Sequence, residues 1–199
     1  MKNETASKAL ARLNDQVIEA KHVKDDFFAK HSTHLIDVAE EMGKCIASGG
    51  KILICGNGGS AADAQHFSGE LVGRFLKERR PLPAISLTTD TSTLTAIGND
   101  YGYDQVFSRG VQALGNPGDM LFAISTSGKS PNVLKAVDEA HKKNMKVVAM
   151  TGDSGGPLGE IADFHLNVSQ GKNSPRIQEV HIMIVHILVD ILDEYYLKG

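Results

Sequence analysis

The sequence predicts an α/β fold with three layers, in which helices cover both faces of a doubly wound parallel sheet. From Lys51 onward, short apolar runs recur, each followed by Gly, Ser, Thr or Asn and usually then by a helical pattern. Short apolar strands that alternate with helices are typical of βαβ units around a buried parallel sheet. The five runs are KILIC at 51, PAISL at 83, DMLFAIS at 119, KVVAM at 146 and DFHLNV at 163.

Residues 5–48 precede these runs and are predicted to form two helices, each with one apolar face. The faces are Leu10, Leu13, Val17, Ile18 and Phe28 for the first helix and Leu35, Ile36, Ala39, Met42 and Ile46 for the second. The SGG at 48–50 ends this part, because Gly is favoured after the last turn of a helix. We expect one domain over residues 1–199, with 1–48 as a helical extension that makes oligomer contacts and 49–199 as the α/β core.

Three helical patterns lie within the core: SAADAQHFSGELVGRFL, SPNVLKAVDEAHKKN and RIQEVHIMIVHILVDIL. Ser130 and Pro131 predict the start of the second, because Ser is favoured at the N-cap and Pro at the first helical position. The third is expected to run to about Tyr196. The order of the strands does not follow from these patterns.

Composition excludes several classes of protein. The net charge is −3 over 199 residues with 41% hydrophobic content, so no broad basic surface for nucleic acid is expected, and KERR at 77–80 is interpreted as a solvated loop. Cys45 and Cys55 form no CxxC pair, which predicts reduced thiols and a cytoplasmic location. The N-terminus lacks an apolar signal segment, and no apolar run has the roughly 18 residues of a membrane span, so no membrane association is expected.

Three loops that follow apolar runs are rich in Gly and hydroxyl side chains: GNGGS, STSGKS and TGDSGG. Such loops, beyond the carboxyl ends of parallel strands, bind ligands. Gly56, Gly58 and Ala61 match the relaxed dinucleotide fingerprint, but its acid is expected about 20 residues later and the first after PAISL is Asp90. STSGKS has the end of a P-loop without its first Gly, because position 123 is Ala. Neither nucleotide motif is therefore favoured.

The hydroxyl-rich loop suits a phosphate monoester instead. Ser125, Thr126, Ser127 and Ser130 lie at the expected start of a helix. Several hydroxyls together with free backbone amides bind a phosphate without a metal. Taken alone, such a loop is better explained by turn and capping chemistry. Two such loops on adjacent strand ends favour phosphate binding.

His66 and Glu70 are four residues apart and share one face of the predicted second helix. This spacing suits joint ligation of one cation, and it also occurs in ordinary surface pairs. The pair lies one to two turns beyond the glycine loop, which favours a functional role. The sequence leaves both interpretations open.

The last helix carries Gln178, Glu179, His181 and His186 within an apolar segment. Histidines in such a helix are satisfied core residues or ligands. Gln178 and His186 are eight residues apart, which is about 12 Å along a straight helix. One metal ion would need both side chains nearly fully extended, or a break near Gln178, or ligands from different subunits.

Four segments in order resemble the phosphoheptose isomerase family, a branch of the flavodoxin-like sugar-isomerase (SIS) fold. They are CGNGGSAADAQHFSGEL, LTAIGNDYGYDQVFSR, ISTSGKSPNV and RIQEVHIMIVHIL, and the resemblance covers roughly residues 45–196. It implies a homotetramer with sites near subunit interfaces. The implied reaction converts sedoheptulose 7-phosphate to D-glycero-D-manno-heptose 7-phosphate, the first step toward the ADP-heptose of lipopolysaccharide core.

The resemblance also implies the site residues. The ligands of one Zn²⁺ per subunit are His66, Glu70, Gln178 and His186. The substrate contacts are Asn57, Gly58, Gly59, Ser60, Glu70, Asn99, Asp100, Ser125, Thr126, Ser127, Ser130 and Gln178. Glu70 is the expected base and His186 its acid/base partner, whereas Glu179 and His181 are expected to make structural hydrogen bonds. Pro175 stands where some members carry Asp, so one minor polar contact is in doubt.

Two other functions fit the same fold. One is a non-catalytic tetramer that binds the replication initiator DnaA, and the other is a module that senses sugar phosphates. The resemblance implies that the DnaA-binding class lacks the acid and the second histidine. This chain has Glu70 and His186, which favours catalysis.

Overall fold

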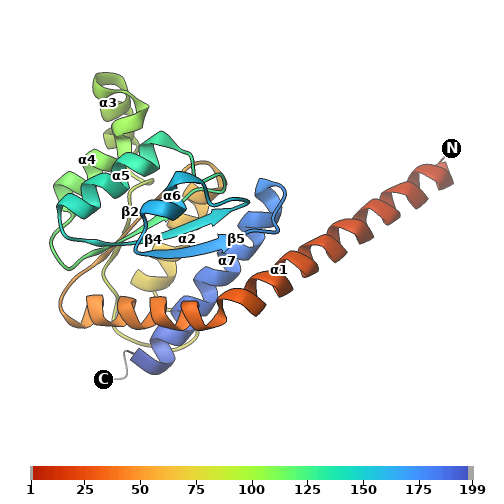
Figure 1. Ribbon diagram of the computed structural model, residues 1–199, viewed down its shortest axis with the longest axis horizontal. Coiled ribbons are helices and arrows are strands. Elements are labelled where there is room, and N and C mark those ends of the chain that lie inside the picture. Colours follow the sequence, from red (N-terminus) through yellow and green to blue (C-terminus); the bar gives the residue numbers. More distant parts are fainter. Residues whose placement is uncertain (1, 197–199) are drawn as a thin grey trace.

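A five-stranded parallel sheet lies between two layers of helices in the computed structural model, which describes residues 2–196 (Figure 1). The strands are β1 (Ile52–Gly56), β2 (Ala84–Ser86), β3 (Met120–Ile124), β4 (Lys146–Gly152) and β5 (Phe164–Val168). Their order is β2-β1-β3-β4-β5, and all neighbours pair in parallel. Each strand coincides with one of the apolar runs to within two residues at its end, so the predicted α/β fold is confirmed.

Helices of two groups cover the two faces of the sheet. One layer holds α1 (Lys2–Ala47), α2 (Gly59–Val72) and α7 (Ser174–Ile191). The other holds α3 (Thr91–Tyr101), α4 (Val106–Leu114), α5 (Pro131–Lys142) and α6 (Gly156–Ile161), with a 3₁₀ turn at Tyr103–Gln105. Side chains alternate along each strand, so Ile52 and Ile54 of β1 pack on the first layer. Leu53 and Cys55 pack on the second, which explains why this central strand is apolar on both faces.

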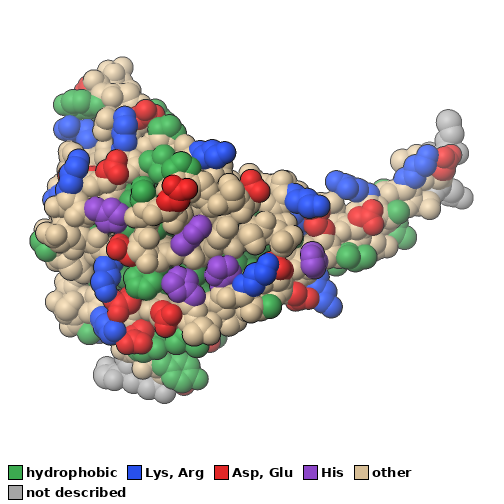
Figure 2. Space-filling view, in the orientation of Figure 1, with side chains coloured by type: hydrophobic (Ala, Val, Ile, Leu, Met, Phe, Trp, Pro, Cys, Tyr) green, Lys and Arg blue, Asp and Glu red, His purple; other side chains and the backbone are tan. Residues whose placement is uncertain are grey.

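The N-terminal extension is one continuous helix of 46 residues, so the prediction of two helices was wrong. Two separate apolar faces indicated two helices, but α1 contains no Pro, and an i,i+4 pair of Lys30 with Asp26 supports the helix between these faces. Only the C-terminal part of α1 packs on the domain. The N-terminal part projects from it (Figure 1), and Figure 2 shows apolar side chains along one side of this arm. Its exposed apolar residues are Leu10, Leu13, Val17 and Ile18.

The predicted start of α5 is confirmed. Pro131 occupies the first turn of α5 after Ser130, although the Ser130 hydroxyl makes no capping bond. The Asn173 side chain caps α7 by accepting from the backbone N–H of Arg176. After Ile191 the chain continues as a π-helical turn, Leu192–Tyr196, so the last helical segment reaches Tyr196 as predicted. No helix among the described residues is long and apolar enough to cross a bilayer.

Candidate active site

The glycine and hydroxyl loops begin side by side at the carboxyl edge of the sheet. Gly56, the last residue of β1, pairs with Ile124, the last residue of β3. The strand order reverses between β1 and β3, and ligands bind at such a switch point. Each loop leads directly into a helix, α2 or α5, so free backbone N–H groups point toward the same region.

Asn57 in the glycine loop is held by two residues that the sequence analysis did not single out. Its amide donates to Asn132 Oδ1 at 2.9 Å and accepts from Asn132 Nδ2 at 2.9 Å. The Tyr103 hydroxyl donates to Asn57 Oδ1 at 3.1 Å. Asn132 is buried at the start of α5. The only signal for Asn132 in the sequence was the position of an amide directly after Pro131, the residue that starts the helix.

The hydroxyl loop is folded onto itself and onto the start of α7. Ser125 and Ser130 hydroxyls lie 3.0 Å apart, and Ser127 Oγ accepts from the Lys129 backbone N–H. Thr126 Oγ1 lies 3.3 Å from Ser174 Oγ, so α7 contributes a further hydroxyl. A cavity of about 400 Å³ opens here, lined by Thr126, Ser127, Asp153, Gly171, Lys172, Asn173, Ser174 and Ile177. Thr126 and Ser127, two of the four predicted hydroxyl residues, therefore border a space that a small anion can enter.

The third loop, TGDSGG, packs against the hydroxyl loop through two glycines. Gly128 has φ of +64°, and a Cβ there would lie 1.9 Å from the carbonyl oxygen of Gly155. No side chain fits between the two loops. Gly128 therefore fixes how closely they approach.

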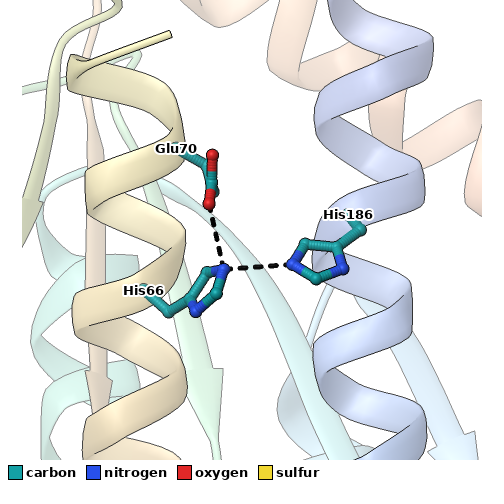
Figure 3. Close-up of side chains that lie close together, drawn as sticks. All are labelled: His66, Glu70 and His186. Carbon is teal, nitrogen blue, oxygen red and sulfur yellow. Dashed lines mark hydrogen bonds and ion pairs between the residues drawn. The ribbon is translucent and has the colours of Figure 1, made fainter. Parts of the chain in front are cut away.

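His66, Glu70 and His186 converge between α2 and α7 (Figure 3). His66 Nε2 lies 3.0 Å from Glu70 Oε1 and 3.0 Å from His186 Nε2, and one ligand atom from each residue lies within 4.8 Å of the others. Tetrahedral Zn²⁺ with bonds of about 2.0–2.1 Å places its ligand atoms about 3.3 Å apart. The donor types and their spacing thus fit a metal ion. Phe75 packs near the His186 ring, with centroids 5.7 Å apart.

Gln178 lies at the glycine loop instead of beside the histidines. A Cβ on Gly59 would meet Gln178 Nε2 at 2.4 Å, so the Gln178 amide covers the first turn of α2. α7 is unbroken from Ser174 to Ile191, which excludes a break near Gln178. His186 is therefore about 12 Å further along the helix. The expectation of an extended or intersubunit arrangement remains a prediction.

Asn99 and Asp100 lie at the C-terminal end of α3, where both are exposed. Asn99 Nδ2 donates to Asp100 Oδ1 at 2.8 Å. The chain returns to the glycine loop three residues later, through the bond from Tyr103 to Asn57. The two residues thus flank the site without joining the His66 cluster.

His181 and Glu179 make structural bonds, as predicted. His181 is fully buried, its Nε2 lies 3.0 Å from the carbonyl oxygen of Thr151, and burial lowers the pKa of its ring to about 4. Glu179 accepts from Arg176 Nη1 at 2.7 Å, and Arg176 Nη1 also donates to the backbone carbonyl oxygen of Gln16 on α1 at 3.3 Å.

Asp63 is a residue that the sequence analysis missed. It is half-buried one turn before His66, and burial raises the pKa of its carboxyl to about 6. Its Oδ2 has no hydrogen-bond partner among the described residues. The carboxyl therefore adds a second acid to the face of α2 that carries His66 and Glu70.

Comparisons with known proteins agree with this geometry. A family profile described as SIS domain matches residues 17–152. The phosphoheptose isomerase of Nitratidesulfovibrio vulgaris is 48% identical over 185 residues, which cover 93% of this chain and 88% of that protein. The structure of phosphoheptose isomerase from Neisseria gonorrhoeae has a TM-score of 0.88 at 46% identity and covers 93% of this chain and 98% of its own. That from Francisella tularensis has a TM-score of 0.90 at 44% identity, with 94% and 98% covered. The chain therefore carries a SIS domain and belongs to the phosphoheptose isomerase family.

Proposed function

We propose that this protein is an aldose–ketose isomerase that converts sedoheptulose 7-phosphate to D-glycero-D-manno-heptose 7-phosphate. One observation carries the proposal: Glu70 and His66, on the helix that begins at the glycine loop, converge with His186 of α7. Relatives named phosphoheptose isomerase support the choice of substrate. On this proposal the reaction is the first step toward the ADP-heptose of lipopolysaccharide core.

Substrate binding is assigned to the loops at the carboxyl edge of the sheet. The proposed contacts are Asn57, Gly58, Gly59, Ser60, Asn99, Asp100, Ser125, Thr126, Ser127, Ser130 and Gln178. The hydroxyl loop holds the phosphate through its side chains and free amides. A phosphate held there fixes the reacting carbons relative to Glu70, and such positioning lowers the barrier by ordering the reactants.

Proton transfer is assigned to Glu70 and His186. Glu70 takes the proton from the carbon next to the ketose carbonyl, which gives an enediol. A proton then returns to the neighbouring carbon, with His186 as the acid/base partner, so the sugar keeps its composition. Both side chains project from helices packed on the sheet, which holds them in place.

The metal is proposed to be one Zn²⁺ per subunit, held by His66, Glu70 and His186 with Gln178 as a further ligand. Such an ion supplies Lewis-acid polarisation of the carbonyl and hydroxyl oxygens. Two imidazoles and a carboxylate are typical zinc donors. Since Glu70 has two roles here, ligation and proton removal compete for its carboxylate.

The proposed assembly is a homotetramer in the cytoplasm. The projecting part of α1 exposes Leu10, Leu13, Val17 and Ile18, which are 57–67% accessible. A contiguous apolar face of this kind is typical of an interface. A partner subunit is also the proposed source of a Gln178 side chain close enough to His186 for joint ligation.

Conversion of sedoheptulose 7-phosphate, followed with and without a chelator, tests the proposal. We expect zinc-dependent turnover that Glu70→Gln lowers by about 100-fold or more. Glu78→Gln removes an exposed acid outside the site and should leave turnover unchanged. No turnover at any zinc level would reject the isomerase, and binding to DnaA would then favour the non-catalytic alternative. Near-normal turnover by Glu70→Gln would reject only its role as base.

A further inference from the structure

Arg79 lies in the loop between α2 and β2 and is not solvated, in contrast to our interpretation of KERR. Its side chain is 13% exposed. Nη2 donates to the carbonyl oxygen of Glu70 at 2.7 Å, and Nη1 donates to that of Leu71 at 2.8 Å. Nη1 also lies 3.1 Å from the carbonyl oxygen of Gly73. One guanidinium therefore binds the last turn of α2.

The last turn of a helix needs such a partner. The final four carbonyls of an α-helix have no intrahelical donor, and a cation there is also favoured by the helix dipole. In α2 the Gly69 carbonyl accepts from the Gly73 N–H, and the Leu71 carbonyl accepts from the Leu82 N–H. The Glu70 carbonyl accepts from Arg79. Arg79 thus binds the backbone of the residue whose side chain reaches His66.

The same guanidinium reaches the helix that carries His186. Arg79 Nε donates to Asp193 Oδ1 at 2.8 Å, and Asp193 follows the end of α7. The Asp193 side chain is 8% exposed, and its Oδ2 has no hydrogen-bond partner among the described residues. Loss of Arg79 would leave this carboxylate buried and unpaired, which is strongly destabilising for that contact.

We propose that Arg79 is a positioning residue that fixes the spacing of α2 and α7 at the level of His66, Glu70 and His186. It links the C-terminal ends of the two helices that supply these side chains, so it acts on the cluster through the backbone and not by contact. The phosphate loops lie at the opposite, N-terminal ends of both helices. Replacement of Arg79 should therefore change the affinity for the metal and the rate of proton transfer more than the affinity for the substrate. The expected effect on turnover rests on the proposed function, whereas the expected effect on metal affinity does not.

Zinc affinity of the folded protein is the decisive measurement, made by competition with a chromophoric chelator. We expect Arg79→Gln to lower Zn²⁺ affinity by about 10-fold or more, as for other residues that orient metal ligands. Under the proposed function kcat falls by a similar factor, while KM for the sugar phosphate stays within about twofold. Arg80→Gln is the matched control, because Arg80 is the exposed neighbour, and it should change none of these values.

Asp193→Asn tests the other end of the contact, and Arg79→Lys keeps the charge without the fork of donors. Both should lower Zn²⁺ affinity in the same direction, and they replace Arg79→Gln if that variant does not fold. A lower melting temperature with unchanged Zn²⁺ affinity in these folded variants would overturn the inference. A wild-type protein that binds Zn²⁺ but does not isomerise the sugar would reject the proposed function and leave the affinity comparison valid.

Discussion

Asn57 and Asn132 exchange two amide hydrogen bonds across 75 residues of sequence. Each side chain donates to and accepts from the other at 2.9 Å, so the Asn57 amide has one fixed orientation. The pair joins the glycine loop to the start of α5, and Asn132 is buried there. The loop that we assign to substrate binding is thereby held by a residue of the neighbouring βα unit.

Removal of Asn132 should therefore loosen the glycine loop. Asn132→Ala leaves the Asn57 amide without its main partner, and a lost buried hydrogen bond of this kind costs about 1–3 kcal/mol. We expect kcat/KM to fall about tenfold or more, mainly through a higher KM. Steady-state kinetics on sedoheptulose 7-phosphate give both constants.

Asn116→Ala is the control for that variant. Asn116 is an exposed amide just before β3, at the opposite edge of the sheet. Its replacement should leave both kinetic constants unchanged. If Asn132→Ala kept the wild-type KM, the amide pair would have no part in substrate binding.

Gly59→Ala should separate the role of Gln178 from the stability of the fold. The new Cβ would meet the Gln178 amide at 2.4 Å, but that amide is the end of a flexible side chain and can move aside. We expect unfolding free energy to change by less than about 1 kcal/mol and activity to fall at least about tenfold, because Gln178 is displaced from the glycine loop.

A second glycine of α2 provides the comparison. A Cβ on Gly69 meets nothing within 4 Å, so Gly69→Ala should stabilise the helix by about 0.5–1 kcal/mol and keep full activity. Denaturant unfolding and turnover of both variants check this. If Gly59→Ala kept wild-type activity, Gln178 would have no part in the reaction at this site.

The elements and loops could be predicted because their signals are local. β1 and β3 are buried on both faces and so are apolar throughout, and Gly, Ser and Pro mark the turns and helix starts that follow them. The i,i+4 spacing of His66 and Glu70 places them on one face whatever the tertiary fold. Each of these features is set by a few neighbouring residues.

The remaining features depend on contacts between distant segments. The Arg79–Asp193 contact spans 114 residues, and the approach of His186 to His66 spans 120. The strand order and the position of Gln178 above Gly59 also follow from packing that no local pattern encodes. The two-helix prediction for α1 was wrong although the relevant signal was local. Two apolar faces indicated two helices, but the residues between them include no Pro or Gly that would end a helix.

Gly128→Ala should destabilise the protein strongly. The residue has φ of +64°, and its Cβ would lie 1.9 Å from the backbone of Gly155, which cannot move as a side-chain end can. Gly118→Ala has a similar φ of +87° but open space around the Cβ, so it carries the conformational cost alone. We expect a loss of about 1 kcal/mol for Gly118→Ala and more than about 2 kcal/mol for Gly128→Ala in urea unfolding. Equal losses would mean that the loops can separate freely.

His181 should make stability fall as the pH is lowered below neutrality. Its Nε2 bonds to the Thr151 carbonyl, and its buried Nδ1 has no hydrogen-bond partner within residues 2–196, so a second proton would create a buried charge without an acceptor. Burial lowers the pKa of His181 from 6.5 to about 4. The unfolded chain therefore takes up the proton first. The contribution to stability is complete above pH 6.5 and is lost progressively down to about pH 4, below which it changes no further.

His181→Gln keeps a side-chain donor but does not titrate, so comparison with the wild type isolates this effect. We expect the wild type to lose up to about 3 kcal/mol more unfolding free energy than the variant between pH 6.5 and 4. His31 and His165, whose pKa values burial also lowers, are present in both proteins and cancel in the difference. Urea unfolding in the presence of a chelator measures this difference in unfolding free energy without a contribution from metal release. Parallel stability curves for the two proteins would show that His181 binds its proton as readily in the folded chain as in the unfolded one.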